Sequence, residues 1–422
     1  MRTFDNFLVC VVLGVLFAAG GVRAQQNPKA NSGSDKPLPA EPAPAEKSSS
    51  ASSPSDTVVK TKAEFSAYTD TDSVTVFTPA VQASIENPLS GWSANGSYLV
   101  DVVSAASVDI VSTASQHWTE VRHAGTLSGT YKPGTVGATV SGAVSSEPDY
   151  LSLSAGGTVN FELANKTANP SLSYAFTHDT AGRTGTPFSV FSQNLARHTI
   201  TGSIELILDP STLVSFSADA ILENGDQTKP YRFLPLFAPN VAPLIPRGAS
   251  IDEVNLRRLP GRVDEHLPGT RNRFAVSGRV AQRLTGSTLI LTERLYADDW
   301  GLKATTTDLR FVVDLSRRVF LWTHLRGHFQ SSVSFWKLAY VGNVSTTGPI
   351  SVPKWRTGDR EESALEAGTF GAGVRFDVGT ETRPTGWSVV GQADLLTTLF
   401  NDTLFIQNRE GFLGVLQLES EF

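Results

Sequence analysis

The chain has 422 residues, a net charge of -6 and 18% charged residues, so it is long enough to bury a large core and is not a basic nucleic-acid binder. Its 35 glycines, set against a single methionine, favour strands and turns over helices. The composition therefore predicts an all-β fold.

Residues 1–24 are predicted to be a secretory signal peptide. Arg2 precedes an apolar run from Phe7 to Ala19, and small residues end the segment at Ala24. The only cysteine, Cys10, lies in this run, so we expect the mature chain to have no disulfide and no cysteine metal site. No later stretch of about 18 apolar residues exists, so a membrane could be crossed only by a closed sheet.

Residues 25–57 are rich in Pro, Ser and Ala and predict a disordered periplasmic tail. Residues 58–90 show only a weak pattern, which predicts a linker or a short helix. From residue 91 to 422 the chain repeats one pattern, in which a segment of alternating polarity is followed by a turn or loop. In "YLSLSAGGTVNFEL", for example, Leu151 and Leu153 alternate with Ser152 and Ser154. This repetition is typical of a transmembrane β-barrel.

The alternation predicts a transmembrane antiparallel β-barrel of about 14 strands, within a range of 12 to 16. In "TLILTERLYADDW" either Glu293 or Arg294 must lie on the apolar face, and the sequence does not decide which. The predicted strands are residues 92–103, 119–131, 135–146, 150–163, 170–179, 195–208, 212–223, 271–284, 287–298, 304–315, 318–330, 364–378, 386–399 and 411–422.

A soluble β-sandwich would also alternate, but these strands are longer than the usual five or six residues. Tight turns such as "YKPGT" and "LDPST" roughly alternate with long loops such as 225–270 and 331–363. Short turns of membrane barrels face the periplasm. We therefore expect a protein of the cell outer membrane with both termini on the periplasmic side.

The last segment places Phe412, Leu416 and Phe422 in one row, where they would face outer-membrane lipid. We expect the terminal Phe422 to be the assembly signal recognised by the barrel assembly machinery. The same alternation assigns a set of charged residues to the lumen: Arg273, Arg279, Arg283, Asp308, Arg310, Asp314, His324, Arg326, His328, Arg375, Asp377 and Asp394. Ion pairs that hold the wall in shape and a water-filled channel with selective charges both remain open.

No catalytic motif is present, so we expect no enzymatic activity and no cofactor. His324 and His328 are four residues apart on one strand, or about 13 Å, which is too far for one metal ion. We therefore predict no metal site. The long apolar loop Lys229 to Gly269 is predicted either to plug the lumen or to cap the rim.

Two stretches resemble a known family. They are "SAASVDIVSTAS", Ser104 to Ser115, and the block from Tyr231 to Arg310, whose most specific words are "DDWGLKA". They are similar to the bacterial outer-membrane β-barrel family catalogued as domain of unknown function 3570. The resemblance implies an outer-membrane barrel with no established activity. A histidine common in the family is replaced by Thr305 or Thr306 here.

The family-specific words contain four candidate loop residues: Asp109, Asp298, Asp299 and Trp300. Such residues more often join loops through hydrogen bonds than bind a ligand or cation. Some family members are encoded beside flavin-transfer and redox proteins, which implies a periplasmic or extracellular redox or export partner. We expect a porin-like passage, or the outer shell of a transport or electron-transfer complex. A non-conducting scaffold is the alternative, and an outer-membrane enzyme is a more distant one.

Overall fold

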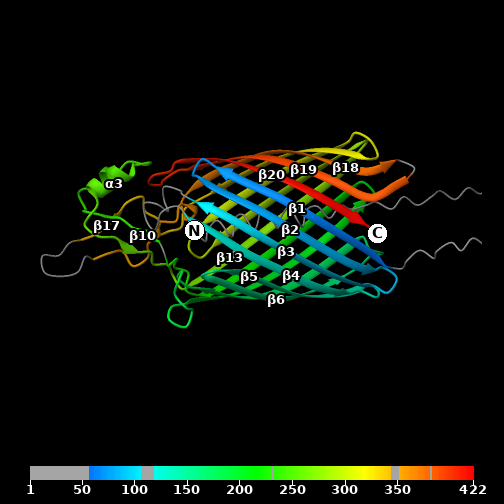
Figure 1. Cartoon of the computed structure of the whole chain (residues 1–422), viewed down its shortest axis with the longest axis horizontal. Coiled ribbons are helices and arrows are strands. Elements are labelled where there is room, and N and C mark those ends of the chain that lie inside the picture. The colour runs from blue at the N-terminus through cyan, green and yellow to red at the C-terminus, as the bar shows by residue number, and fades with distance from the viewer. Residues whose placement is uncertain (1–56, 106–117, 231, 344–350, 381–382) are drawn as a thin grey trace, which may run out of the picture. The chain divides into compact units, whose positions relative to one another are not determined.

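The computed structural model of the chain describes residues 57–105, 118–230, 232–343, 351–380 and 383–422. Within these ranges sixteen strands, each paired antiparallel with its neighbours in chain order, form a closed barrel (Figure 1). The barrel strands are β1 (Val58–Asp70), β2 (Val74–Asn87), β3 (Trp92–Ala105), β4 (Trp118–Tyr131), β5 (Val136–Glu147), β6 (Tyr150–Phe161), β7 (Ala168–Ala181), β8 (Gln193–Asp209), β9 (Thr212–Gly225), β13 (Thr270–Leu284), β14 (Ser287–Asp298), β15 (Lys303–Asp314), β16 (Val319–Gln330), β18 (Leu365–Thr380), β19 (Arg383–Phe400) and β20 (Asn408–Glu421).

The predicted fold class is confirmed, with sixteen strands rather than about fourteen. The two additional strands are β1 and β2, so the prediction of a linker or short helix over residues 58–90 is wrong, and the barrel begins at Val58. Two features hid these strands. Proline cannot donate to a strand ladder, and Pro79 lies inside β2, whose pairing with β3 skips Thr78 and Pro79. The outward row of β1 also includes small side chains such as Ala63 and Ala67.

The barrel closes between its first and last strands. β1 pairs with β20 from Lys60 opposite Glu421 to Asp70 opposite Gly411. Beyond this ladder, Val59 and Phe422 exchange two backbone hydrogen bonds of 2.9 Å. A closed ring leaves no strand edge with unpaired backbone groups, which is the condition for a sheet to exist in lipid.

The outer surface of the barrel is an apolar belt. On β6, Leu153 is 50% exposed on the outside, whereas the inward hydroxyl of Ser154 bonds to that of Thr177 at 2.8 Å. Large apolar side chains are exposed in the same alternating way on every barrel strand from β1 to β20. An apolar exterior around a polar interior is the pattern of a membrane barrel, and the chain is an outer-membrane β-barrel.

Phe422 lies in this outward belt. Its side chain is 63% exposed and its ring packs edge-on against Trp387 at a centroid distance of 5.7 Å. Phe412 and Leu416 are exposed in the same row, while Leu413 between them is buried inside. The predicted lipid-facing row is therefore present. The role of Phe422 in assembly stays a prediction.

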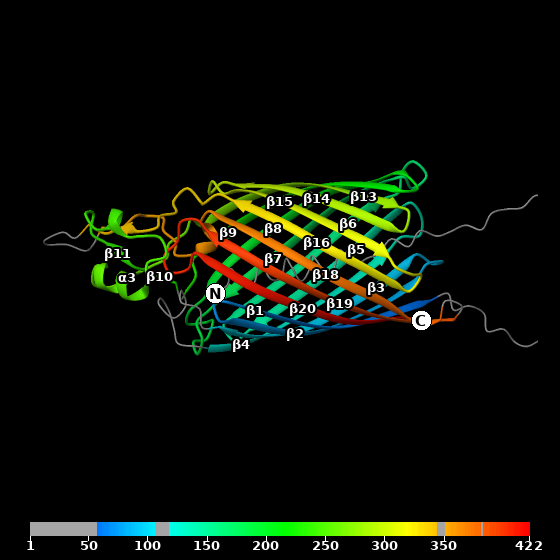
Figure 2. The same cartoon turned by 90° about the horizontal axis from the view of Figure 1, so that it is seen from above.

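The two ends of the barrel differ. Val58 and Glu421 lie at the end with short connections, such as residues 88–91, 132–135, 210–211 and 285–286. The long connections 226–269 and 331–364 lie at the opposite end, together with the shorter 401–407. These three connections form a cap lobe beyond that end of the barrel, seen in both views (Figure 1 and Figure 2).

The cap lobe contains short elements only: β10 (Phe233–Leu234), β11 (Leu236–Phe237), η1 (Ala242–Leu244), α3 (Ile251–Arg257), β12 (Val263–Asp264), β17 (Tyr340–Val341) and η2 (Arg360–Glu362). β10 pairs antiparallel with β12, and β11 pairs parallel with β17. Among the described residues, no helix is long and apolar enough to cross a membrane.

The lobe has its own apolar core. Phe237, Ile245, Ala249 and Val254 are buried together, and Phe405 from the β19–β20 connection packs against them. The apolar residues of the Lys229–Gly269 loop therefore cover one another beyond the barrel end. This packing fits a cap on the rim, and the plug stays a prediction.

A buried ion pair supports the lobe. Arg232 pairs with Asp359, and its guanidinium also lies 3.6 Å from Glu265. Burial raises the pKa of Asp359, but the Arg232 charge outweighs burial, and the net pKa lies below the ordinary value. A carboxylate with a lowered pKa stabilises the fold above its unfolded pKa, about 3.9, and that contribution is lost as the pH falls through the folded value.

We expect Asp359→Asn to loosen the lobe, because it removes the carboxylate that pairs with the largely buried Arg232, and breaking a buried ion pair costs about 3 to 5 kcal/mol. At pH 7 the variant should be cleaved by trypsin in the lobe faster than the wild type. The wild-type lobe should become sensitive to pepsin as the pH falls below about 4. Asp252→Asn on the exposed side of α3 serves as the control and should behave like the wild type. Equal trypsin resistance of all three proteins would contradict this role of the pair.

The direction of the side chains is testable with two adjacent residues of β5. Val140 is 70% exposed on the outside, and Ser141 points inward. Val140→Arg places a charge near the bilayer midplane at a cost of about 2 to 4 kcal/mol, whereas Ser141→Arg places it in the lumen. Folding into lipid vesicles, followed by the gel shift between folded and heated protein, should fail for the first variant only. Equal folding of both would refute the assigned faces.

Candidate functional site

The inner rows of β13 to β16 form a basic wall. Outward residues on these strands, such as Val276, Leu291 and Leu325, are exposed to the lipid side. The alternate positions carry seven arginines against three aspartates: Arg271, Arg273, Arg279, Arg283, Arg294, Arg310 and Arg326, with Asp298, Asp308 and Asp314. The lumen wall predicted from the sequence is therefore strongly charged on this side.

Several of these arginines are neutralised by pairs between strands. Arg273 lies 2.9 Å from Glu223, Arg294 lies 2.8 Å from Asp219, and Arg283 pairs with Asp314. On the next strands Arg375 pairs with Asp377 at 2.9 Å and with Glu419 at 2.7 Å. The predicted lumen set lacked Arg271, Arg294, Asp219 and Glu223, because only the strand register shows which charges meet.

Three predicted residues, Arg279, Arg310 and Arg326, have no ion-pair or hydrogen-bond partner inside the described ranges. Arg279 and Arg326 lie in one row of the ladder, three strands or about 14 Å apart. Arg326 is opposite Asp308 in the ladder between β15 and β16, and Arg310 is opposite His324. Three cationic groups thus remain available to an anion in the lumen.

Asp308 is already engaged by a histidine. His324 Nε2 lies 2.7 Å from Asp308 Oδ2, and His324 Nδ1 lies 4.0 Å from Asp394 Oδ1. Gly371 is opposite both His324 and Asp394, and a Cβ on Gly371 would lie 1.8 Å from Asp394 Oδ1. The missing side chain of Gly371 is what lets the Asp394 carboxylate reach across β18. The predicted residues Asp308, His324 and Asp394 are thus brought together from three strands.

His328 has separate partners. Its Nδ1 lies 2.8 Å from the hydroxyl of Thr306, and its Nε2 lies 3.4 Å from Gln330 Oε1. His324 and His328 therefore do not share a ligand position, as expected from their spacing on one strand.

The wall on the other side of the barrel is rich in hydroxyl groups, and it also holds ion pairs such as Asp101 with Arg122 and Asp179 with Arg197. Along β3 to β8 inward serine and threonine side chains bond in pairs across the strands. The pairs are Ser97 with Thr126 at 2.6 Å, Thr130 with Thr139 at 2.8 Å, Ser154 with Thr177 at 2.8 Å, Thr158 with Ser173 at 2.8 Å, and Ser171 with Ser203 at 2.7 Å. A basic wall therefore faces a wall of hydroxyl groups.

The residues of the "DDW" motif, Asp298 to Trp300, join loops to strands. Asp298 lies 2.6 Å from Arg271, and Asp299 accepts a bond of 2.7 Å from the Asn272 side chain. Trp300 is buried, donates to the Thr270 carbonyl at 2.9 Å and lies under the Arg271 guanidinium. These contacts fit the loop-joining interpretation. Asp109 lies outside the described residues.

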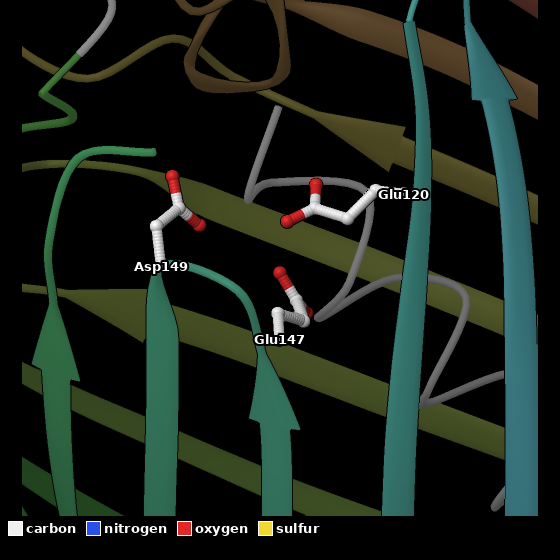
Figure 3. A group of neighbouring side chains, drawn as sticks. All are labelled: Glu120, Glu147 and Asp149. Carbon is white, nitrogen blue, oxygen red and sulfur yellow. The ribbon is translucent and has the colours of Figure 1, made fainter. Parts of the chain in front are cut away.

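Three carboxylates that the sequence did not single out meet near the long-loop end. Glu120 on β4, Glu147 at the end of β5 and Asp149 in the following turn each offer an oxygen within 4.8 Å of the others (Figure 3). Oxygen ligands of this kind suit Ca²⁺ or Mg²⁺. One Asp149 oxygen also accepts a bond from Thr184. Their positions are distant in the sequence, and only the barrel register brings them together.

The choice between Glu293 and Arg294 is settled by the structure. Arg294 points inward to Asp219 and Ser277. Glu293 lies in the outward row of β14, between Leu291 and Leu295, which are both exposed. A carboxylate therefore stands in the apolar belt.

One family model and several solved structures are similar to this chain. Residues 112–383 match the family model described as "Protein of unknown function (DUF3570)". No curated protein matches the chain. Among solved structures, OccK5 (OpdH) of Pseudomonas aeruginosa aligns with a TM-score of 0.40 and 8% identity over 87% of this chain and 98% of that one.

The outer membrane protein opdK of Pseudomonas aeruginosa gives a TM-score of 0.40 at 6% identity, over 87% of this chain and 99% of that chain. A mutant of the ferric enterobactin receptor PfeA of the same organism gives a TM-score of 0.40 at 10% identity. The alignment covers 81% of this chain and 53% of the receptor chain. The closed barrel is established by the strand pairing itself and does not rest on these alignments.

The space left by Gly371 yields a stability test. Gly371→Ala drives a methyl group into the Asp394 carboxylate, and we expect a loss of about 1 to 3 kcal/mol. Gly142→Ala is the control, since its Cβ would meet only the Ser154 carbonyl at 3.7 Å. The measurement is urea unfolding in lipid vesicles. A Gly371→Ala midpoint equal to that of Gly142→Ala would show that Asp394 does not need this space.

Proposed function

Because the chain belongs to the family described as protein of unknown function DUF3570, an outer-membrane barrel family, we propose that it is a porin-like passage that favours anionic solutes. The observation that carries this proposal is the group of three unpaired arginines, Arg279, Arg310 and Arg326, on one wall of the lumen. A guanidinium is permanently charged and matches the geometry of carboxylate and phosphate groups.

The size of the barrel supports a passage. Barrels of eight strands are filled by their own side chains, whereas sixteen-stranded porins leave an aqueous channel. The hydroxyl wall opposite the arginines offers donors and acceptors to a hydrated solute, and the carboxylates Asp101 and Asp179 on this wall are paired with arginines. An anion can therefore contact the arginines on one side and exchange its water for hydroxyl groups on the other.

The ion pairs of the wall explain why these three arginines set the selectivity. Paired residues such as Arg273 with Glu223 contribute little net field at a distance. Asp308 is the carboxylate nearest Arg310 and Arg326 in the ladder, and His324 already occupies one of its oxygens. The cationic field of Arg310 and Arg326 is thus only partly cancelled.

The orientation follows from the connections. We place both termini and the short turns in the periplasm and the cap lobe outside the cell, since short periplasmic turns and long outer loops are usual in such barrels. The cap lobe would then be the first surface that a solute meets. This placement supports entry from outside past the exposed arginines of α3 and its flanks, such as Arg257 and Arg262.

A second candidate is a non-conducting shell for a redox or export partner. It is favoured by one observation: the inner rows of β19, β20 and β1 are buried, including Asp394, Gln417 and Glu64. A lumen that is filled on this side would carry little current.

Conductance across a planar bilayer tests the proposal. The wild type should carry a steady current whose reversal potential in a KCl gradient indicates chloride preference. The double variant Arg310→Gln and Arg326→Gln should lose most of that preference, and the matched variant with Lys at both positions should keep it. A silent barrel would favour the shell, and an open channel that prefers potassium would overturn the anion assignment.

A further inference from the structure

Several polar side chains interrupt the apolar belt on the outside of the barrel, among them His123, His178, His198 and Glu293, and two of these sites can meet between copies. The first is Glu293 on β14, whose two carboxylate oxygens accept bonds of 2.5 Å from the hydroxyls of Thr305 and Thr307. Ionisable side chains within the bilayer are costly and usually have a partner or a function. The two threonines satisfy part of the carboxylate, and its remaining acceptor capacity faces hydrocarbon.

The second site is His198 on β8. Its imidazole is exposed on the outside, and its Nδ1 lies 2.8 Å from the hydroxyl of Tyr174. The rings of Tyr174 and Phe176 lie 6.0 Å and 5.1 Å from the imidazole. Within the described ranges the second nitrogen, Nε2, has no partner. This aromatic knob therefore presents one free polar atom to the lipid side.

The surface around Glu293 is shaped to receive such a knob. Glu293 is paired with Gly278 on β13 and with Thr307 on β15. Thr307 is in turn paired with Gly327 on β16. The adjacent positions carry large exposed side chains, Val276 and Leu295 among them. Glu293 and Thr307 thus lie between two glycines, with the ring of Phe216 3.6 Å from the position of a Cβ on Gly278, and we define Gly278, Glu293, Thr307 and Gly327 as the recess.

The strand ladder relates the two sites. Glu293 is opposite Gly278, Gly278 is opposite Phe216, and Phe216 is opposite Ile204 on β8. This row is not level in the membrane, because the strands of a barrel are tilted by about 40°. The depth of Glu293 must therefore be corrected along β8.

The direction of the correction follows from the turns. Thr212, the first residue of β9, lies at the short-turn end of the barrel and is opposite Gln282, two residues before the end of β13 at Leu284. A row of paired residues therefore moves towards the long-loop end as it passes from β9 to β13. A tilt of about 40° shifts the row by about 1.2 residues per strand, or about four residues over three strands. The residue of β8 at the same depth in the membrane as Glu293 is therefore about four residues before Ile204, near Ile200. His198 is the next outward residue of β8 from Ile200. Copies in one membrane share its plane, so two groups at equal depth can meet between copies.

The angle between the sites selects the number of copies. β8 and β14 are three strands apart in a ring of sixteen, which is about 68° (3 × 360°/16). In a closed head-to-tail ring of n copies the directions to the two neighbours differ by 180° − 360°/n, about 60° for three copies and about 90° for four. Three copies give the closest match.

We infer that the barrel assembles into a ring of three copies, in which the aromatic knob of one copy enters the recess of the next and His198 Nε2 donates a hydrogen bond to Glu293. The contact removes both polar groups from lipid, since each supplies what the other lacks. The assembly does not depend on whether the lumen conducts.

Cysteine cross-linking tests the contact directly. Cys10 is the only cysteine of the chain and lies in the predicted signal peptide, so introduced cysteines would be the only thiols. Within one barrel positions 198 and 293 are separated by three strands, about 14 Å, and by six residues along β8, about 20 Å, so they lie beyond disulfide reach. The double variant Glu293→Cys with His198→Cys should therefore form covalent dimers and trimers in the membrane under oxidation. The matched pair Glu293→Cys with His123→Cys, on the distant β4, should stay monomeric. Monomers in both cases would overturn the inference.

The mass of the complex in mild detergent provides a second measurement. The wild type should elute as a trimer of the 45.2 kDa chain, less its signal segment. Glu293→Leu suits lipid and keeps the barrel folded, yet it should shift the protein to a monomer, and so should His198→Leu. His178→Leu, an outward histidine on β7, should remain a trimer. A wild-type monomer, or trimers of all four proteins, would refute the proposed contact.

Discussion

The structure depends on one constraint: every backbone polar group within the membrane must find its partner in the sheet, since lipid offers none. The pairing of β1 with β20 meets this constraint by removing the two free edges that sixteen strands would otherwise expose. Once the ring is closed, the two-residue period of each strand divides the side chains into a lipid row and a lumen row. The apolar belt, the charged wall and the hydroxyl wall all follow from that division.

The lumen row shows how a charged interior is kept stable and still available to solutes. Most arginines of β13 to β16 have carboxylate partners, which limits the cost of burying them and fixes the wall. The three arginines without partners are the exception, and they lie beside a pair, Asp308 and His324, that is already engaged. Gly371 belongs to the same arrangement, since its missing side chain brings Asp394 towards the histidine. A stable wall and a local cationic field can therefore coexist.

Much of the fold was readable from the alternation of side chains, because one face of each strand touches lipid. β1 and β2 were not predicted as strands, because Pro79 and the small side chains of β1 weaken that alternation. The lumen residues were predictable by face, but their partners were not. Glu223 for Arg273 and the meeting of Glu120, Glu147 and Asp149 depend on register between strands that are distant in the sequence. From the sequence, either Glu293 or Arg294 could face the lumen. The ion pair between Arg294 and Asp219 shows that Arg294 faces the lumen.

Closure of the ring can be tested by joining its first and last strands. Ala67 on β1 is opposite Gly414 on β20, so cysteines at these positions lie within disulfide distance if the barrel closes as described. In membrane-inserted protein the Ala67→Cys, Gly414→Cys variant should oxidise within a single chain and keep the folded form on gels. Folded, inserted protein in which these cysteines stay reduced under oxidant would contradict the closed sixteen-stranded barrel.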